Sequence, residues 1–148
     1  MKLLSLIFSF ISVVVLSSSM SLSRVSPTVG SEAPDFAVFN KTNSIRPADY
    51  KGKYITLNFW SVKDAASRER NQRLSAECRA AGQEFVGICV DDDRSLVREI
   101  IAQDGLDATQ QYMASDIRKG NPVESYEVHS GLRAFEINPF GNIERIID

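Results

Sequence analysis

The chain has few of the residues that usually carry redox, metal or nucleic-acid chemistry. Its 148 residues include only two cysteines, Cys78 and Cys89, and a single histidine, His129. The cysteines stand too far apart for a CxxC pair, and no second cysteine pair or histidine cluster has the spacing of a zinc site. The formal net charge of −2 favours neither a nucleic-acid partner nor a basic patch for a membrane surface. We therefore expect no metal, no cofactor and no nucleic-acid partner.

The N-terminal segment has the layout of a signal peptide. Met1 and Lys2 precede an apolar run over residues 3–16, which is too short to cross a bilayer comfortably, and small serines follow as far as Ser23. No cysteine follows the run, which argues against a bacterial lipoprotein anchor. We predict a signal peptide over residues 1–23 and an exported domain over residues 24–148, periplasmic or secreted. An uncleaved anchor is the alternative, and we expect membrane association only in that case.

Hydrophobic periodicity predicts alternating strands and helices after this segment. The predicted strands are residues 53–60, 84–91, 133–138 and 143–147, with a short edge strand at 37–39 and another short strand at 112–114. Helices are predicted over residues 65–81 and 95–103, and Gly82 is placed to end the first in a left-handed cap. This order indicates a single α/β domain with the strand 53–60 inside its central sheet.

The longer predicted helix has an inner face at helical spacing and a charged outer face. The inner face is predicted to carry Ser67, Asn71, Leu74, Cys78 and Ala81, and the outer face Arg68, Glu69, Arg70, Gln72, Arg73 and Glu77. Cys78 and Cys89 would then either form a disulfide, worth roughly 3 kcal/mol, or remain buried free thiols. We favour free thiols, because only one face of the strand that carries Cys89 looks at this helix.

Four segments occur in an order and spacing that together are specific. They are residues 30–36 (GSEAPDF), 50–60 (YKGKYITLNFW), 86–91 (VGICVD), and 126–128 (YEV) with 135–141 (FEINPFG). In this respect the chain resembles the thioredoxin-like family, in particular exported thiol-disulfide oxidoreductases of the TlpA/ResA type and their AhpC/TSA relatives. The resemblance runs from about residue 29 to the end of the chain. It implies a thioredoxin-like fold, with a central mixed sheet flanked by helices, and thiol-disulfide exchange as the family's activity.

The departures from that family all lie at the positions that carry out its reaction. Its W-A-x-W-C-x-x-C run aligns with Trp60, Asp64 and Ser67, so that a carboxylate and a hydroxyl stand where the attacking and resolving cysteines belong. Leu132 stands where the family has a cis-proline, and we expect its peptide to be trans because a non-proline cis bond costs roughly 2.5–4 kcal/mol. Since exchange needs a thiolate and a second, resolving thiol, the resemblance implies a degenerate site without catalytic residues.

The degenerate site can still be a binding surface, and we predict that Trp60, Asp64, Ser67, Leu132 and Arg133 form it. Asp64 would lie at a helix N-terminus, where backbone N–H groups and the helix dipole favour negative charge. Plainer interpretations stay open: Asp64 only caps the helix, for about 1 kcal/mol, Ser67 bonds to the local backbone, and Trp60 only packs at the strand end.

Two other candidate groups are weaker. His129 is interpreted as a loop residue rather than an acid–base catalyst. Asp91, Asp92 and Asp93 are interpreted as a solvated turn, one of whose members caps the next helix, rather than as a cation site.

Two functional hypotheses from different classes follow. The first is an exported, redox-inactive domain that binds a protein or peptide. The alternative is a thiol-disulfide oxidoreductase or peroxidase that uses Cys78 or Cys89, which requires one of these thiols to be accessible. A degenerate domain without any retained activity is a third possibility.

Overall fold

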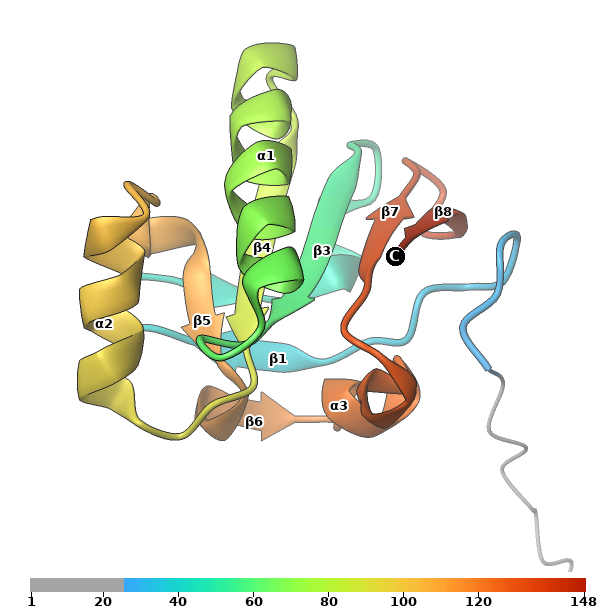
Figure 1. The fold of residues 1–148 in the computed structure, drawn as a ribbon. Helices are drawn as coiled ribbons and strands as arrows, with labels where there is room; N and C mark the ends of the chain where they lie inside the picture. The colour runs from blue at the N-terminus through green and yellow to red at the C-terminus, as the bar shows by residue number, and fades with distance from the viewer. Residues whose placement is uncertain (1–25) are drawn as a thin grey trace, which may run out of the picture.

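A five-stranded mixed sheet organises residues 26–148, the part of the chain that this computed structural model describes (Figure 1). Its strand order is β5 (Gln111–Met113), β4 (Glu84–Cys89), β3 (Ile55–Trp60), β7 (Ala134–Ile137) and β8 (Ile143–Ile147). β3 pairs in parallel with β4 and antiparallel with β7. The inner position predicted for this strand is therefore confirmed. The predicted signal peptide lies outside the described residues, and within residues 26–148 every helix is too short or too polar to cross a membrane.

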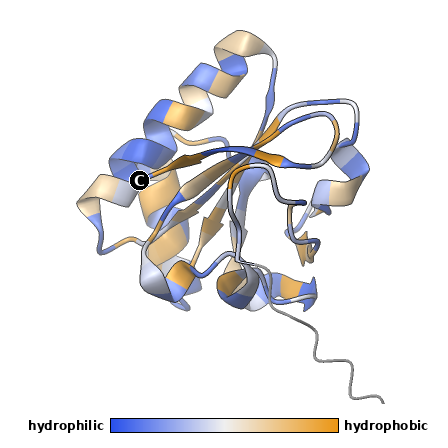
Figure 2. Ribbon diagram, turned by 90° about the vertical axis from the view of Figure 1, so that its right-hand side faces the viewer, coloured by the Kyte–Doolittle hydropathy of each residue, from blue (hydrophilic) through white to orange (hydrophobic). Residues whose placement is uncertain are grey.

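Two helices, α1 (Ala65–Ala81) and α2 (Arg94–Gln103), cover one face of this sheet. α1 has the predicted bounds, because both of its ends are set by local chemistry. Asp64 caps its N-terminus, and Gly82 ends it at φ 65° and ψ 29°, the left-handed conformation that glycine adopts at low cost. Figure 2 shows that hydrophobic residues concentrate along the central strands, whereas the helices alternate between hydrophobic and hydrophilic positions.

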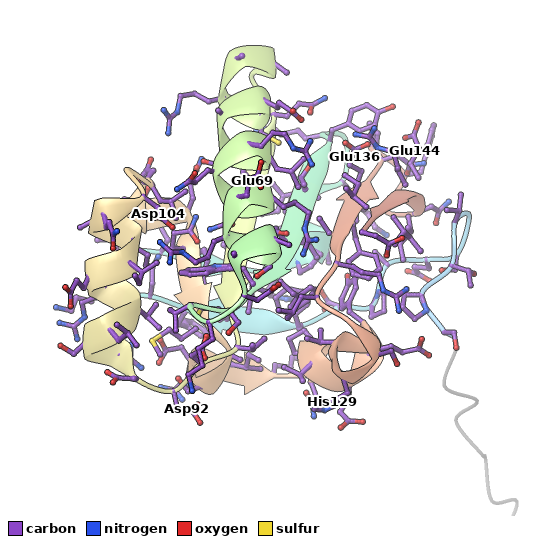
Figure 3. The ribbon with its side chains drawn as sticks, viewed as in Figure 1. Glu69, Asp92, Asp104, His129, Glu136 and Glu144 are labelled. Atoms are coloured by element: carbon purple, nitrogen blue, oxygen red, sulfur yellow. The ribbon has the colours of Figure 1, made fainter. Side chains whose placement is uncertain are left out.

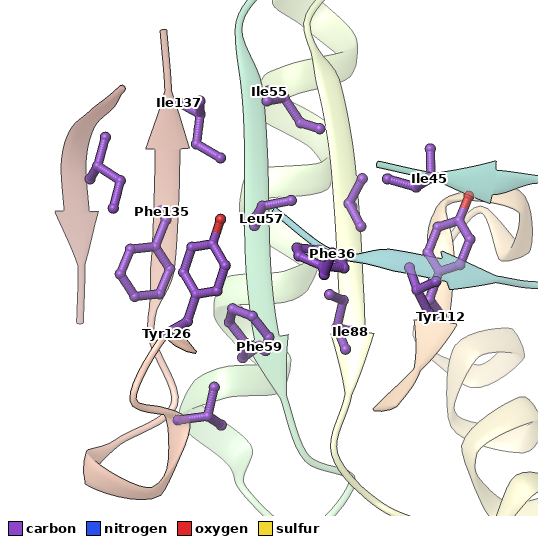
Figure 4. Packing of buried hydrophobic residues seen from close by; sticks show 14 residues of the cluster. Phe36, Ile45, Ile55, Leu57, Phe59, Ile88, Tyr112, Tyr126, Phe135 and Ile137 are labelled. Atoms are coloured by element: carbon purple, nitrogen blue, oxygen red, sulfur yellow. The ribbon is translucent and has the colours of Figure 1, made fainter. Parts of the chain in front are cut away.

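A second, three-stranded sheet covers part of the opposite face. Its order is β2 (Ser44–Ile45), β1 (Ala37–Phe39) and β6 (Ile117–Lys119), and the short helix α3 (Pro122–Ser125) follows it. Aromatic rings fill the space below β3 and β7 (Figure 4): the Tyr126 ring centroid lies 5.4 Å from that of Phe59 and 4.9 Å from that of Phe135. The candidate site lies outside this core, at one end of β3 and the start of α1.

Several predictions are wrong in detail. The strand at 37–39 is not an edge strand but the middle strand of the second sheet. Of the residues on α1, Arg70 was predicted to face outward and is buried at 7% exposure, whereas Ala81 was predicted to face inward and is exposed. The strands predicted over 53–60, 84–91 and 133–138 are each shorter in the structure, where they span Ile55–Trp60, Glu84–Cys89 and Ala134–Ile137.

Candidate functional site

The start of α1 is closed by hydrogen bonds among its own residues. The Asp64 carboxylate accepts from the backbone N–H of Ser67 at 3.1 Å. The Ser67 hydroxyl, which is fully buried, donates to the Asp64 carbonyl at 3.0 Å and accepts from Ser61 N–H at 3.2 Å. The predicted cap at Asp64 and the predicted local bonding of Ser67 are thus both present. Asp64 remains half-buried at the surface, whereas Ser67 presents nothing to a ligand.

One turn further along α1, Arg70 lies under the site. Its Nε donates to Asn58 Oδ1 at 2.8 Å, and its Nη2 donates to the carbonyl of Leu132 at 2.7 Å and to that of Phe59 at 3.3 Å. Burial lowers the pKa of Arg70, and no carboxylate of the described residues lies within ion-pair distance. Arg70 therefore joins α1, the end of β3 and the loop at Leu132 through hydrogen bonds alone.

A row of buried amides continues from Arg70 across the sheet. Asn58 donates to Asn71 Oδ1 at 2.9 Å, and Asn71 donates to Gln111 Oε1 at 3.2 Å. Gly87 makes room for this row, because a Cβ added there would lie 2.2 Å from Gln111 Oε1 and 2.9 Å from Asn71 Oδ1. Sequence reasoning missed the network. The available signal was an asparagine inside a buried strand facing an asparagine on the inner helix face.

The loop at Leu132 lies beside the start of α1. All peptide bonds of the described residues are trans, as we predicted for Leu132. Leu132 is half-buried against the main core, and the carbonyl of Arg133 accepts from Phe59 N–H at 3.1 Å. The reciprocal bond from Arg133 N–H to Phe59 is absent from the described residues, and the Phe59 carbonyl accepts from Arg70 instead. Arg70 thus lies where β7 separates from β3.

Trp60 does not reach the surface. Its side chain is 0% exposed and packs with residues of β4, α2 and β5, namely Cys89, Val97, Ile100 and Met113. Its indole Nε1 has no hydrogen-bond partner in the described residues. Of the five predicted binding residues, the structure therefore brings Asp64, Leu132 and Arg133 to the surface and keeps Trp60 and Ser67 in the interior.

Both cysteines are buried free thiols, as we favoured. Cys78 is 4% exposed and Cys89 is 0% exposed, and they belong to separate core clusters. Burial raises the pKa of both thiols, and that of Cys89 rises to about 12. The Cys89 thiol donates to the Asp91 carboxylate at 3.4 Å, an oxygen that also accepts from Val62 N–H. Neither thiol is accessible or ionised at neutral pH, which counts against a role as nucleophile.

The remaining candidates have local structural contacts. Asp93 caps α2 by accepting from the N–H groups of Ser95 and Leu96, as predicted for one member of the triad. His129 lies at the periphery beyond α3, 3.4 Å from Glu124, and its side chain is 71% exposed (Figure 3). Residues 26–148 contain no group of three or more histidine, cysteine or acidic side chains arranged to hold a metal ion.

The best-formed pockets lie away from the candidate site. Pockets elsewhere in the described residues have volumes of about 200–280 Å³, and these are not lined by Asp64, Leu132 or Arg133. Arg133 contributes a half-buried cation, with Nε 3.7 Å from Asp148 Oδ1. A ligand here would contact an acidic helix start, an apolar loop residue and an arginine.

The chain is similar to known proteins in both sequence and structure. The model of the AhpC/TSA family matches residues 29–146. A crystal structure of a thioredoxin-like protein from Parabacteroides distasonis is 26% identical, with 83% of this chain and 89% of that chain covered and a TM-score of 0.66. The thioredoxin domain of a thiol-disulfide oxidoreductase from Bacteroides vulgatus is 24% identical, covering 82% and 89%, with a TM-score of 0.66. No functionally curated protein matches the chain significantly.

A more distant neighbour has the same fold. A secreted Mycobacterium tuberculosis disulfide oxidoreductase homologous to E. coli DsbE is 18% identical, with 76% of this chain and 81% of that chain covered and a TM-score of 0.62. The predicted thioredoxin-like fold, a central mixed sheet with flanking helices, is therefore confirmed.

Proposed function

The chain belongs to the AhpC/TSA family, and we propose that it is an exported, redox-inactive member that binds an extended protein or peptide segment. The observation that carries this proposal is the position of its sulfur atoms. Both thiols are buried in the core, and the helix start where the family holds its nucleophile carries Asp64.

Thiol-disulfide exchange needs a thiolate that can reach a disulfide sulfur. The Asp64 carboxylate lies at the helix N-terminus, where it accepts a hydrogen bond from Ser67 N–H. A carboxylate cannot form the covalent bond to a disulfide sulfur that exchange requires. The buried Ser67 hydroxyl cannot resolve a mixed disulfide. We therefore propose that the chain keeps the family's fold but does not carry out the family's reaction.

The loop at Leu132 supports binding of an extended segment. The backbone N–H group of Leu132 donates to no group of the described residues, whereas its carbonyl accepts from Arg70. An unpaired donor in a half-buried loop suits a carbonyl of an added strand, a common mode of peptide recognition. The Arg133 guanidinium would favour an acidic side chain in that segment.

The first experiment tests for activity. The purified domain, with dithiothreitol as donor, should neither reduce insulin disulfides nor consume hydroperoxide faster than the uncatalysed reaction. Turnover above that background that is lost in Cys78→Ser or Cys89→Ser would show a working thiol and refute the loss of redox chemistry.

A second experiment restores the sulfurs. Asp64→Cys combined with Ser67→Cys should form a disulfide and give weak insulin reduction, because the helix N-terminus lowers the pKa of a thiol placed there. Leu132→Pro added to this pair should raise the rate. Asp64→Ala with Ser67→Ala is the matched control for folding. A folded double-cysteine variant whose pair neither oxidises nor titrates below a free cysteine would show that Asp64 is not at the family's nucleophile position.

A third experiment tests binding and export. An array of capped random peptides should retain the domain, and Arg133→Glu should abolish retention of the acidic members while the exposed Arg73→Glu should not. Equal retention by both variants would refute the assigned surface.

Export predicts that the full chain, expressed in a Gram-negative host, is recovered from the periplasm without residues 1–23. Recovery of the intact chain from the cytoplasm would refute it.

A further inference from the structure

A groove separate from this surface is lined by residues of α2, of the turn that joins β1 to β2, and of β5. Its volume is about 280 Å³, close to the lower end of small-ligand pockets, roughly 300 Å³. Its apolar lining comes from α2 and the β5 edge, namely Val97, Ile101, Ala108, Tyr112 and Met113. Asn40 holds the turn in place by donating to the Thr109 carbonyl at 3.1 Å.

Cations dominate the rim of this groove. Lys41 and Arg98 are exposed, and neither has a carboxylate within ion-pair distance in the described residues. Arg94 also lines the groove but is already paired with Asp116 through hydrogen bonds of 2.9 and 2.6 Å. The rim therefore has two unpaired positive charges, on a chain whose formal net charge is −2.

Gln111 also lines the groove, but its side-chain amide belongs to the buried row under α1, where Asn71 donates to its Oε1 at 3.2 Å. The charge complementarity of the groove therefore rests on Lys41 and Arg98.

We infer that this groove binds a small acid with an apolar body and one carboxylate. The hydrocarbon would lie against Val97, Tyr112 and Met113, and the carboxylate would lie between Lys41 and Arg98. The chain's own N-terminal segment does not suit the groove, because it contains Lys2 and Arg24 and no acidic residue before Glu32. The inference is independent of the proposed function, since the groove shares no residue with the surface at Asp64, Leu132 and Arg133.

Titration calorimetry with sodium decanoate, below its micellar concentration, tests this inference. Wild-type protein should bind decanoate at one site, more tightly than decanol and decyltrimethylammonium, which carry the same chain with no charge or a positive one. Binding should change the fluorescence of Trp60, the only tryptophan, because it packs against Val97 and Met113 of the lining. Lys41→Glu with Arg98→Glu should weaken decanoate binding by about tenfold or more, and leave decanol binding unchanged.

Both substituted side chains are exposed, so the variant should keep the wild-type unfolding midpoint. Arg73→Glu with Arg79→Glu is the matched control on exposed positions of α1 and should bind decanoate as wild type does. Three results would overturn the inference: no binding of decanoate, equal binding of decanoate and decanol, or equal loss in the control variant. Binding of a capped acidic peptide in place of decanoate would also overturn it, and would assign the groove to a protein partner.

Discussion

Removal of the Arg70 side chain should weaken the hydrogen bonding that holds the candidate site together. Arg70→Ala removes the donors that hold Asn58 Oδ1, the Leu132 carbonyl and the Phe59 carbonyl. No other described residue donates to the Leu132 carbonyl. The loop that carries Leu132 and Arg133 would then keep only the bond from Phe59 N–H near this point.

The size of the effect follows from these contacts. Asn58 is 0% exposed, and leaving its oxygen without a donor costs about 1–3 kcal/mol. The bond to the Leu132 carbonyl contributes about 1 kcal/mol, because water can replace it in part. Release of a buried charge that lacks a carboxylate partner offsets about 1 kcal/mol. We therefore expect Arg70→Ala to lower the free energy of unfolding by about 1–3 kcal/mol.

Urea unfolding measures this change, with Trp60 fluorescence as the signal. Arg70→Met keeps an apolar stem of similar length but no donors, so it separates hydrogen bonding from packing and should lose most of the same stability. Arg73→Ala is the matched control on α1, since Arg73 is exposed and, among the described residues, its side chain forms an ion pair only with Glu77. It should lose less than about 0.5 kcal/mol. If Arg70→Met is as stable as wild type, the network contributes nothing to stability and its assigned role is wrong.

Three further predictions follow from the described contacts. Both cysteines should be inert toward a disulfide reagent in the folded protein and react fully in urea, since burial raises the pKa of Cys89 to about 12; fast reaction of the folded protein would contradict this. Gly87→Ala should destabilise by about 1–3 kcal/mol in urea unfolding, because its Cβ would meet the buried Gln111 amide, and a neutral result would contradict that packing. Hydrogen bonds from Arg94 lower the pKa of Asp116 below 3.8, so the stability it contributes is present above that pH and lost as the pH falls through the lowered pKa. Arg94→Gln should therefore flatten the loss of stability between about pH 5 and pH 2, and an unchanged slope would count against the pair.

Local chemistry made part of this protein predictable from its sequence. Asp64 and Gly82 determine the two ends of α1 through a side-chain cap and a left-handed residue, and neither needs a distant partner. The apolar run of β4 indicated a strand buried on both faces, and the structure has it between β3 and β5. The family resemblance adds a prediction, that Asp64, Ser67 and Leu132 stand where the family has its two cysteines and its cis-proline.

Other features depend on residues far apart in the chain. β1 became the middle strand of a second sheet because Val38 pairs with both Ile45 and Ile117, and three-residue strands carry too little periodicity to predict such pairing. Trp60 was included in the predicted binding surface, yet residues of α2, β4 and β5 bury it completely. A strand-end position alone does not tell which later helix will pack over it.

Arg70 shows the same division most clearly. By sequence it is a charged residue on a helix rich in exposed charges, and the free energy of desolvation predicts that it faces water. Only the folded chain supplies Asn58 Oδ1 and the Leu132 carbonyl, which come from opposite sides of α1 in the sequence and satisfy a buried guanidinium together. The sequence by itself determined the helix, its caps and the absence of a CxxC pair. The tertiary structure decided which polar side chains the core accepts, because burial of a polar group depends on partners that only folding brings within hydrogen-bond distance.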